Sequence, residues 1–391
     1  MSISVPIRHI VYDCIPGAFA GGVQKMVFEL ASAQRRLGAD VEIWAPNAIR
    51  KGAVEDHDGL PIRYFNSYGF GHVVKSKQIF RDLTRLSPET VFHAHNTFHP
   101  LNLQVAAAAH AKAHKVFYHP HGALDPVLFN DSTVKSLKKR LYIRFLALKK
   151  LNRATGIIAL TPLESKQLKS LGVTSPIHVV PNGIKPLGKA TEPEVQAFRR
   201  RHALAGSIPT LLFVGRIHPK KRIEDIVSAL STLTSSNRLV QLVIAGDPQA
   251  CPEYHSELCK LAERLGVKDR VYWVGFLNEK EKLAAYAAAH FFVHSSDSEG
   301  MALSILEGMS SGLPVVVTRG CYMQDAADAG TLVQCEQGAA ALGEALGSLL
   351  NDATKALALA QSGQKYVHST HAWPMLAQRL LTIYAEGVLR V

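Results

Sequence analysis

Two glutamates, Glu299 and Glu307, stand eight positions apart in the most informative run of this sequence. An apolar strand is expected over 291–294, Gly300 follows the first glutamate, and a helix is expected over about 304–312. A strand that leads through a glycine turn into a helix directs backbone N–H groups and the positive end of the helix dipole at one spot, which suits phosphates or sugar hydroxyls. Eight residues span a little over two helical turns, so we expect the carboxylates to flank that spot. The alternative is two solvated glutamates, one at the helix start and one on its exposed face.

Two cations follow another predicted strand, Leu211–Val214. Arg216 stands at the carboxyl end of this strand, and Lys221 stands five residues further on, near a helix start. Arginine offers a planar fork of donors and lysine a point charge, so the pair suits a diphosphate. With Glu307 accepting hydrogen bonds from a ribose, these side chains would form a nucleotide site without a metal ion. A basic surface turn is the alternative.

The first half of the chain carries a second group of candidates. His121 precedes a glycine just after the predicted strand Val116–His119, where a neutral imidazole can hydrogen-bond a substrate hydroxyl or take part in proton transfer. His95 and Asn96 follow the preceding strand and are expected on the acceptor side. Gly22 begins a predicted helix and is a weaker candidate for a phosphate-facing turn. For His121, a histidine satisfied within its own loop is the alternative.

Short apolar segments alternate with amphipathic ones along the whole chain, which predicts parallel, doubly wound α/β sheets. A break at Pro181-Asn182-Gly183 separates two such series. We therefore expect two Rossmann-like domains, 1–186 and 187–371, facing a cleft, with a final helix over 372–391 packing back on the first. The expected strands are His9–Asp13, Val41–Ala45, Val91–His93, Val116–His119, Ile157–Leu160, Leu211–Val214, Leu242–Ala245, Val271–Val274, Phe291–His294 and Val315–Thr318.

The composition is that of a globular protein, and 391 residues suffice for two cores. The five cysteines form no CxxC pair and are expected to be free thiols of a reducing cytosol. No signal peptide is evident, and no segment approaches the ~20 apolar residues of a membrane-spanning helix.

The net charge of +12 is partly local. No acidic residue lies between Asp131 and Glu164, and lysines, arginines and apolar residues alternate over Lys135–Arg153. This pattern predicts an amphipathic helix with a cationic face. Such a helix could pack on its own domain, contact an anionic membrane surface or bind nucleic acid. No nucleic-acid-binding motif is present, and no nucleic-acid partner is expected.

Taken in chain order, the motifs are Gly21-Gly22, His121-Gly122, Pro181-Asn182-Gly183, Gly215-Arg216 with Lys221, Gly246, Val274-Gly275, Glu299 to Glu307, and Gly312-Leu313-Pro314-Val315-Val316. This order resembles the retaining GT-B glycosyltransferases of the family 4 group (glycosyl transferases group 1), over nearly the whole chain. The two glutamates with the upstream cations are its most specific part.

The resemblance implies that the second domain binds a nucleotide sugar and the first binds the acceptor. By position, Glu299 would contact hydroxyls of the donor sugar and Glu307 the ribose. Arg216 and Lys221 would hold the diphosphate and stabilise its charge as it leaves, and His121 would help to orient the sugar. No cofactor and no metal ion are expected. Further donor-side positions are Gly22, Gly275, Phe276, Gly300, Met301, Ala302 and Leu303.

Some positions depart from the common pattern. Met301-Ala302 stands where Phe-Gly or a similar pair is usual, and Arg222 stands where glycine is common. Other positions resemble the enzymes of bacterial surface polysaccharides, so a lipid-linked or glycan acceptor and a cytoplasmic location, peripheral at the inner membrane face, are expected. GDP-mannose and UDP-glucose are the leading donors. A GT-B-fold nucleotide-sugar epimerase and a non-catalytic glycan-binding protein are the alternatives.

Overall fold

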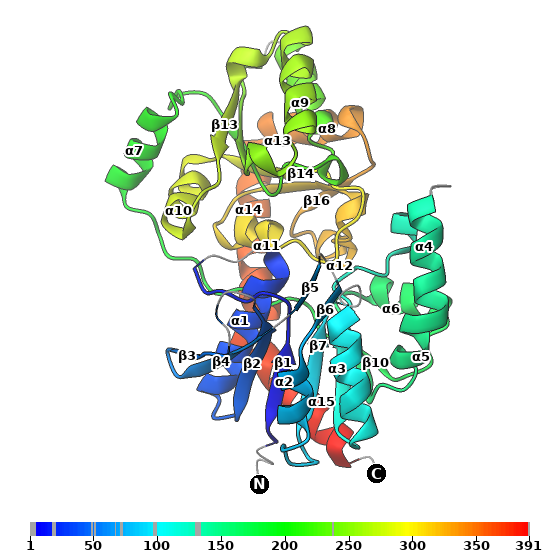
Figure 1. Ribbon diagram of the computed structural model, residues 1–391. Helices are drawn as coiled ribbons and strands as arrows, with labels where there is room; N and C mark the ends of the chain where they lie inside the picture. The colour runs from blue at the N-terminus through cyan, green and yellow to red at the C-terminus, as the bar shows by residue number, and fades with distance from the viewer. Residues whose placement is uncertain are drawn as a thin grey trace. The chain divides into compact units, whose positions relative to one another are not determined.

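The computed structural model describes residues 5–17, 21–47, 50, 52–66, 68–70, 73–96, 100–129, 134–236 and 238–389. The chain divides into two compact units (Figure 1), the first made of Met1–Lys185 with His371–Val391 and the second of Pro186–Thr370. The boundaries expected from the sequence lie one residue from these.

The first unit contains an eight-stranded sheet in the order β10-β9-β8-β7-β1-β2-β4-β3. All neighbouring strands in it are parallel except β3 and β4, which form an antiparallel pair. Asp58 and Gly59 join these two strands with positive φ angles of 55° and 81°, the conformation that an Asp-Gly hairpin turn requires. The strands are β1 (Ile7–Ile10), β2 (Val41–Pro46), β3 (Val54–His57), β4 (Leu60–Phe65), β7 (Val91–His95), β8 (Lys115–His119), β9 (Gly156–Ala159) and β10 (Ile177–Val179), with β5 (Tyr68–Phe70) and β6 (Val73–Lys75) in a separate hairpin.

One expectation for this sheet was wrong. The first strand ends at Ile10 instead of Asp13, where the φ angle of 53° is incompatible with an extended strand. The antiparallel hairpin of β3 and β4 was not predicted, although its Asp-Gly pair is a recognisable turn signal.

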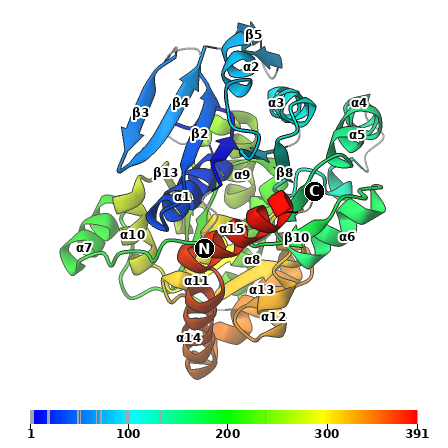
Figure 2. The ribbon, with the colours of Figure 1, turned by 90° about the horizontal axis from the view of Figure 1, so that it is seen from below.

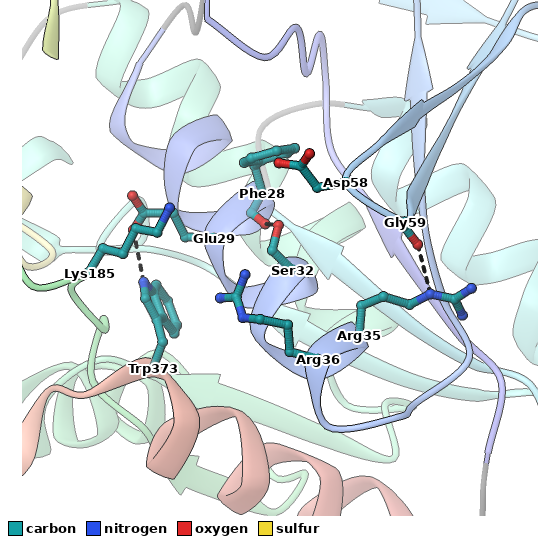
Figure 3. Close-up of a pocket in the computed structure, with 9 residues that line it drawn as sticks. All are labelled: Phe28, Glu29, Ser32, Arg35, Arg36, Asp58, Gly59, Lys185 and Trp373. Carbon is teal, nitrogen blue, oxygen red and sulfur yellow. Dashed lines mark hydrogen bonds between the residues drawn. The ribbon is translucent and has the colours of Figure 1, made fainter.

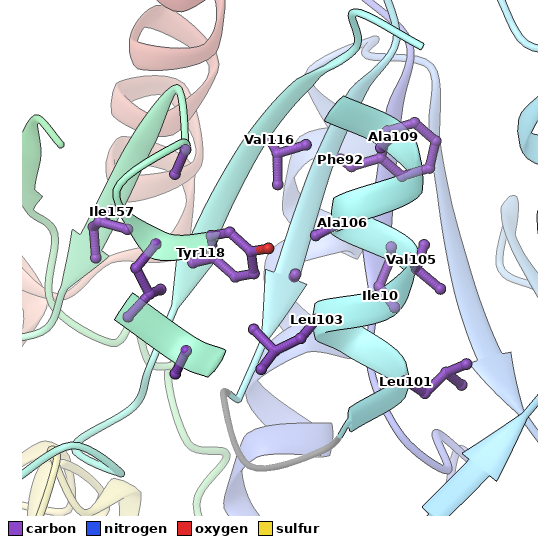
Figure 4. Close-up of a cluster of buried hydrophobic side chains, with 14 of the residues drawn as sticks. Ile10, Phe92, Leu101, Leu103, Val105, Ala106, Ala109, Val116, Tyr118 and Ile157 are labelled. Carbon is purple, nitrogen blue, oxygen red and sulfur yellow. The ribbon is translucent and has the colours of Figure 1, made fainter. Parts of the chain in front are cut away.

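Side chains of the first sheet alternate between two faces. On one face Phe92, Val116 and Tyr118 pack against α3 (Figure 4). On the other face His9 and His93 contact side chains of α1 and α15, which lie side by side (Figures 1 and 2). The helices of this unit are α1 (Gly22–Arg36), α2 (Lys77–Leu83), α3 (Pro100–Ala111), α4 (Val134–Tyr142), α5 (Leu148–Leu151), α6 (Pro162–Ser170) and α15 (Trp373–Leu389), with the 3-10 turn η1 (Pro126–Phe129) and the π-helical turn η2 (Ile143–Ala147).

The last helix returns to the first unit through contacts near residue 183. A Cβ atom on Gly183 would lie 2.3 Å from the Trp373 ring, so only glycine allows this approach. Ile184 forms a β-bridge with Ala372, and the Trp373 indole N–H donates to Glu29 Oε2 at 2.8 Å. The Asn-Gly pair predicted as a break between domains is therefore also where the start of α15 packs against the first unit.

The second unit contains a parallel six-stranded sheet in the order β13-β12-β11-β14-β15-β16. Its strands are β11 (Thr210–Val214), β12 (Gln241–Ala245), β13 (Val271–Gly275), β14 (Phe291–His294), β15 (Val315–Thr318) and β16 (Val333–Cys335). Only β16 was not predicted, because it is three residues long and half-buried. The helices are α7 (Glu192–Arg201), α8 (Ile223–Ser235), α9 (Pro252–Arg264), α10 (Glu279–Ala288), α11 (Leu303–Ser310), α12 (Gln324–Asp328), α13 (Ala339–Leu350) and α14 (Ala353–Thr370), with the 3-10 turns η3 (Pro219–Lys221), η4 (Pro248–Ala250), η5 (Lys268–Arg270) and η6 (Arg319–Cys321).

Among the helices in the described ranges, none combines the length and the apolar character needed to cross a bilayer.

Candidate functional site

In the second unit the loops after β11 and β14 bring Lys221 and Glu299 together as an ion pair. Lys221 ends η3, and Glu299 lies in the loop after β14. The loops are tied by Ser295, whose hydroxyl donates to the carbonyl oxygens of Lys221 at 2.9 Å and Arg222 at 2.8 Å. The sequence placed both residues after strands, and the parallel pairing of β11 with β14 makes those strand ends neighbours.

The Glu299 side chain is 11 % exposed, and donors surround its carboxylate. The Ser296 hydroxyl donates to the Glu299 carboxylate, and His294 Nε2 lies 3.3 Å from Glu299 Oε1. The backbone N–H of Glu299 donates to the carbonyl oxygen of Gly320 at 2.9 Å. Burial alone would raise the pKa of Glu299, but the charge of Lys221 and the hydrogen bonds from His294 and Lys221 lower this pKa well below its ordinary value. Glu299 is therefore ionised and fixed in place.

Glu307 lies in α11 and is only 4 % exposed, which excludes a solvated glutamate on an open helix face. Lys282 Nζ lies 3.0 and 3.2 Å from its two carboxylate oxygens, and the Tyr286 hydroxyl donates to Oε2 at 2.9 Å. Both partners come from α10, four residues apart on one helix face. Lys282 and Tyr286 were not predicted from the sequence, although their spacing of four residues was a usable signal.

The other donor-side residues predicted in the second unit lie at the same edge of its sheet. Gly275 ends β13 with a φ of 74°, which favours glycine, and Phe276 beside it is 76 % exposed. Arg216 is exposed and forms no ion pair with any residue the structure describes. The segment Gly300, Met301 and Ala302 is partly exposed and leads into α11, whose first residue is Leu303.

Gly320 was not predicted, although it shapes this loop. A Cβ atom there would lie 2.2 Å from the Ser296 carbonyl oxygen and 2.5 Å from that of Asp297. Those atoms belong to the backbone just before Glu299, so the close approach requires glycine.

In the first unit three residues with left-handed backbone follow neighbouring strands. Asp13 has a φ of 53° after β1, Asn96 a φ of 68° after β7 and His121 a φ of 57° after β8. Left-handed conformations of residues other than glycine cost free energy and are concentrated at functional sites. His121 is partly exposed, and burial among its neighbours lowers its pKa to about 3, so the ring is neutral at pH 7.

The position expected for His95 was wrong. Its side chain is completely buried, because it lies on the face of the sheet that α1 and α15 cover. Asn96 is partly exposed and stays a candidate, and Gly22 is the exposed first residue of α1.

Histidines are the residues of the described chain that could hold a metal ion. Ring nitrogens of His9, His93 and His95 lie within 4.8 Å of one another, as do those of His95, His119 and His121. Hydrogen bonds between rings already engage His9, His95 and His121, and both groups consist of neutral histidines without a carboxylate to balance a cation. We therefore interpret them as a hydrogen-bonded cluster.

A cavity of about 330 Å³ lies in the first unit beside α1 (Figure 3). Glu29, Arg36, Lys185 and Trp373 are among its lining residues. None of the residues predicted from the sequence lines it.

The basic segment Lys135–Arg153 forms α4, η2 and α5. Its apolar residues separate into two sets: Ile143, Ala147 and Leu151 are buried in the core, whereas others remain in solvent. The segment is thus helical, as predicted, but not all of its apolar residues face the core. The exposed apolar side chains are Leu137 at 56 %, Leu141 at 48 %, Phe145 at 65 % and Leu146 at 53 %.

Two family models match the chain. The model described as glycosyl transferases group 1 matches residues 194–366, and the model described as glycosyl transferase 4-like domain matches residues 21–183. The first match lies within the second unit and the second within the first.

Curated relatives are distant, and their matches extend over between 47% and 94% of the chain. The D-inositol 3-phosphate glycosyltransferase of Kineococcus radiotolerans is 25% identical over 94% of this chain and 91% of its own length. A GDP-mannose-dependent phosphatidylinositol monomannoside mannosyltransferase of Corynebacterium glutamicum is 24% identical over 73% of each chain. The alpha-monoglucosyldiacylglycerol synthase of Streptococcus pneumoniae is 28% identical over 47% of this chain, and the match spans only 42% of that relative.

Solved structures share the whole fold. Sucrose-phosphate synthase from Thermosynechococcus elongatus superposes with a TM-score of 0.79 at 21% identity, covering 97% of this chain and 98% of that one. HepE from Anabaena in complex with UDP-glucose gives a TM-score of 0.78 at 19% identity, covering 99% and 100%. These matches confirm the predicted GT-B fold of two parallel-sheet α/β domains.

Proposed function

The chain belongs to the glycosyl transferases of group 1, and we propose that it is a retaining, metal-independent hexosyltransferase. The donor is a nucleoside-diphosphate hexose of the GDP-mannose or UDP-glucose type, and the acceptor is a glycan or a lipid-linked sugar. Relatives named for glucosyl-diacylglycerol and phosphatidylinositol mannoside support a lipid-linked acceptor. The observation that carries the proposal is the Lys221–Glu299 ion pair at the strand ends of the second unit, whose side chains are only 13 % and 11 % exposed.

In this proposal the second unit binds the donor. Lys221 and Arg216 bind the diphosphate, Glu299 accepts hydrogen bonds from the sugar, and Glu307 accepts them from the ribose. The support is that Glu307 is buried, that the Glu299 side chain is only 11 % exposed, and that fixed partners hold both carboxylates, so they need little rearrangement to bind hydroxyls. His121 of the first unit, neutral and partly exposed, hydrogen-bonds a substrate hydroxyl.

The proposed chemistry breaks the bond between the anomeric carbon and the diphosphate oxygen, which keeps the electron pair. The acceptor oxygen then bonds to the anomeric carbon from the same face, and its proton passes to the leaving diphosphate. Negative charge grows on the diphosphate as the bond breaks, and the cations stabilise that charge. No side chain has to act as a strong base.

We further propose that α4, η2 and α5 contact an anionic membrane surface while the enzyme reaches a lipid-linked acceptor. Leu137, Leu141 and Phe145 are spaced by four residues and are exposed beside Lys138 and Arg144. An apolar stripe flanked by cations is the pattern of helices that lie in the lipid interface. A helix that only packed on its own unit would have no reason to expose four large apolar side chains.

The proposal is tested in two steps. Melting temperatures with UDP, GDP and their sugars identify the nucleotide, because a ligand that binds the native state raises its stability. Transfer is then measured with the selected donor, and NMR of the product reports whether the anomeric configuration is retained. Free sugar or an isomer formed without acceptor would favour the epimerase, and binding without turnover would favour a glycan-binding protein.

Lys221→Ala is the matched variant for the diphosphate site, with Lys268→Ala as a control on the exposed surface of the same unit. We expect the first to lower kcat/KM by about a hundredfold or more, as for removal of one preorganised charge from a transition state. The control should keep the wild-type value. Full turnover of a folded Lys221→Ala protein would contradict the proposed role.

A further inference from the structure

The face of the first sheet that α1 and α15 cover carries histidines from three adjacent strands. Strand register places His9 of β1 beside His93 of β7, and His95 of β7 beside His119 of β8. Because side chains alternate along a strand, these four rings share one face. The ring of His121 stacks on that of His119, with 3.8 Å between ring centroids.

Three hydrogen bonds connect this cluster from the interior to His121. His9 Nε2 lies 2.7 Å from Gln34 Oε1, and His9 Nδ1 lies 2.9 Å from His95 Nε2. His95 Nδ1 lies 3.0 Å from His121 Nε2. The chain of groups is therefore Gln34, His9, His95 and His121.

The donors and acceptors in this chain of hydrogen bonds can be assigned. A neutral imidazole has one N–H and one lone pair, and a carbonyl oxygen only accepts. His9 must then donate to Gln34 from Nε2, so its Nδ1 accepts from His95 Nε2. By the same step His95 Nδ1 accepts from His121 Nε2, which leaves His121 with its lone pair on Nδ1.

All three rings are neutral, as this argument requires. Burial lowers the pKa of His9 to about 4 and that of His121 to about 3, and burial together with the surrounding histidines lowers the pKa of His95 well below its ordinary value. At pH 7 none of them carries a second proton.

The Gln34 amide oxygen faces His9, whereas its amide nitrogen has no hydrogen-bond partner among the described residues. Tyr384 of α15 contacts the neighbouring ring: its hydroxyl lies 2.6 Å from Nδ1 of His93, to which it donates if His93 carries its proton on Nε2. The direction of the hydrogen-bonded chain therefore follows from the 2.7 Å contact between the Gln34 amide oxygen and His9 Nε2.

The backbone of His121 is held separately by Glu164 of α6. The Glu164 carboxylate accepts from the N–H of Gly122 at 2.7 Å and from the N–H of Leu160 at 2.6 Å. These bonds stabilise the loop in which His121 adopts its left-handed conformation. Ring and backbone of His121 are thus fixed by different groups.

We propose that Gln34, His9 and His95 are positioning residues that hold His121 in the Nε2–H tautomer, so that its Nδ1 accepts a hydrogen bond from a sugar hydroxyl of the substrate. This inference rests on the proposed function, because it gives His121 a substrate. It excludes His121 as a proton donor to the leaving group.

The test reads the tautomer directly, without turnover. In the full chain labelled with 15N-histidine, long-range 1H–15N spectra distinguish protonated, unprotonated and metal-bound ring nitrogens, and single substitutions assign the rings. We expect Nε2–H for His9, His95 and His121. In Gln34→Leu the acceptor is lost, and His121 should become a mixture of both tautomers, whereas Gln34→Glu, which keeps an acceptor, should retain Nε2–H.

Kinetics supply the second readout. Gln34→Leu should lower kcat about ten- to hundredfold, the range for groups that orient a functional histidine, with little change in KM for the donor. Gln104→Leu, on α3 and outside the cluster, is the matched control and should behave as wild type. If Gln34→Leu does not fold, His9→Phe interrupts the same chain and carries the same expectation.

A wild-type His121 protonated on Nδ1, metal-type shifts of the ring nitrogens, or a folded Gln34→Leu protein with unchanged tautomer and kcat would each overturn the inference. Absence of transfer by the wild-type protein with every nucleotide sugar would instead overturn the proposed function, while the spectra still decide the tautomer.

Discussion

Lys282 Nζ lies 3.0 Å from Glu307 Oε1 and joins the helix α10 to the helix α11. Tyr286, one turn along α10, donates to the other carboxylate oxygen. A carboxylate that is 4 % exposed needs such partners, because burying an unpaired charge is costly. The two partners orient the Glu307 carboxylate.

The first prediction concerns the ribose. If Glu307 accepts hydrogen bonds from ribose hydroxyls, the wild-type protein should bind the selected nucleoside diphosphate about ten- to hundredfold more tightly than its 2′,3′-dideoxy form, because a hydrogen bond to a charged group contributes about 1.5–3 kcal/mol. In Glu307→Gln, which can keep the bond from Tyr286, this difference should shrink several-fold. Isothermal titration of both ligands measures it, with Glu263→Ala on the exposed surface as the control. An unchanged ratio in Glu307→Gln would show that the ribose binds elsewhere.

The second prediction concerns Gly320. A Cβ atom at this position would lie 2.2 Å from the Ser296 carbonyl oxygen, so Gly320→Ala must displace the loop that carries Glu299. We expect a loss of about 1–3 kcal/mol in the free energy of unfolding and a weaker nucleotide affinity. Gly206→Ala is the control, because nothing lies within 4 Å of a Cβ atom there. Urea unfolding and nucleotide titration measure both effects, and equal stability of the two variants would contradict the close approach.

The third prediction concerns acid. The unfolded chain protonates its histidines below about pH 6.5. Burial lowers the pKa of His9 to about 4 and the pKa values of His95 and His119 well below their ordinary value, so these rings stay neutral in the native state. The native state therefore loses stability as pH falls from 6.5 towards 4, by up to about 1.4 kcal/mol per pH unit for each histidine. Glu164, whose pKa burial raises to about 7, acts in the opposite direction and offsets one of them. Urea unfolding between pH 7.5 and 5 measures the slope.

A matched variant isolates this effect. Neither ring nitrogen of His119 has a hydrogen-bond partner among the described residues, so His119→Phe keeps an aromatic ring and removes one titrating group. The variant should fold and show a slope smaller by about 1.4 kcal/mol per pH unit. A slope equal to that of the wild type would mean that His119 is protonated in the native state.

The fourth prediction concerns the membrane. Phe145→Glu should abolish most co-sedimentation with vesicles that contain anionic lipid. The substitution removes a large exposed apolar group and adds a negative charge that the anionic lipid head groups repel. Leu357→Glu in α14 of the second unit is the control, since Leu357 is 59 % exposed and lies outside the basic segment. Wild-type binding that did not depend on anionic lipid, or equal loss in both variants, would count against a role for this segment.

The sequence alone determined the elements and the chemistry available at their ends. Apolar periodicity located most parallel strands, and Phe291–His294 and Val315–Thr318 have the predicted bounds. Lys221 and Glu299 each follow a predicted strand, so they were expected at the same edge of one sheet, because parallel strands end on the same side. Signals of this kind are local, so a single chain segment carries them.

Tertiary structure decided which groups meet. Lys282 and Glu307 belong to different helices, and Gly320 lies on a third segment, so their contacts depend on strand order and helix packing. His95 was expected to line a binding surface, but the register of β7 between β1 and β8 and the return of α15 enclose it. Strand order, register and the placement of a distant helix depend on long-range packing free energy, which the periodicity of one segment does not report.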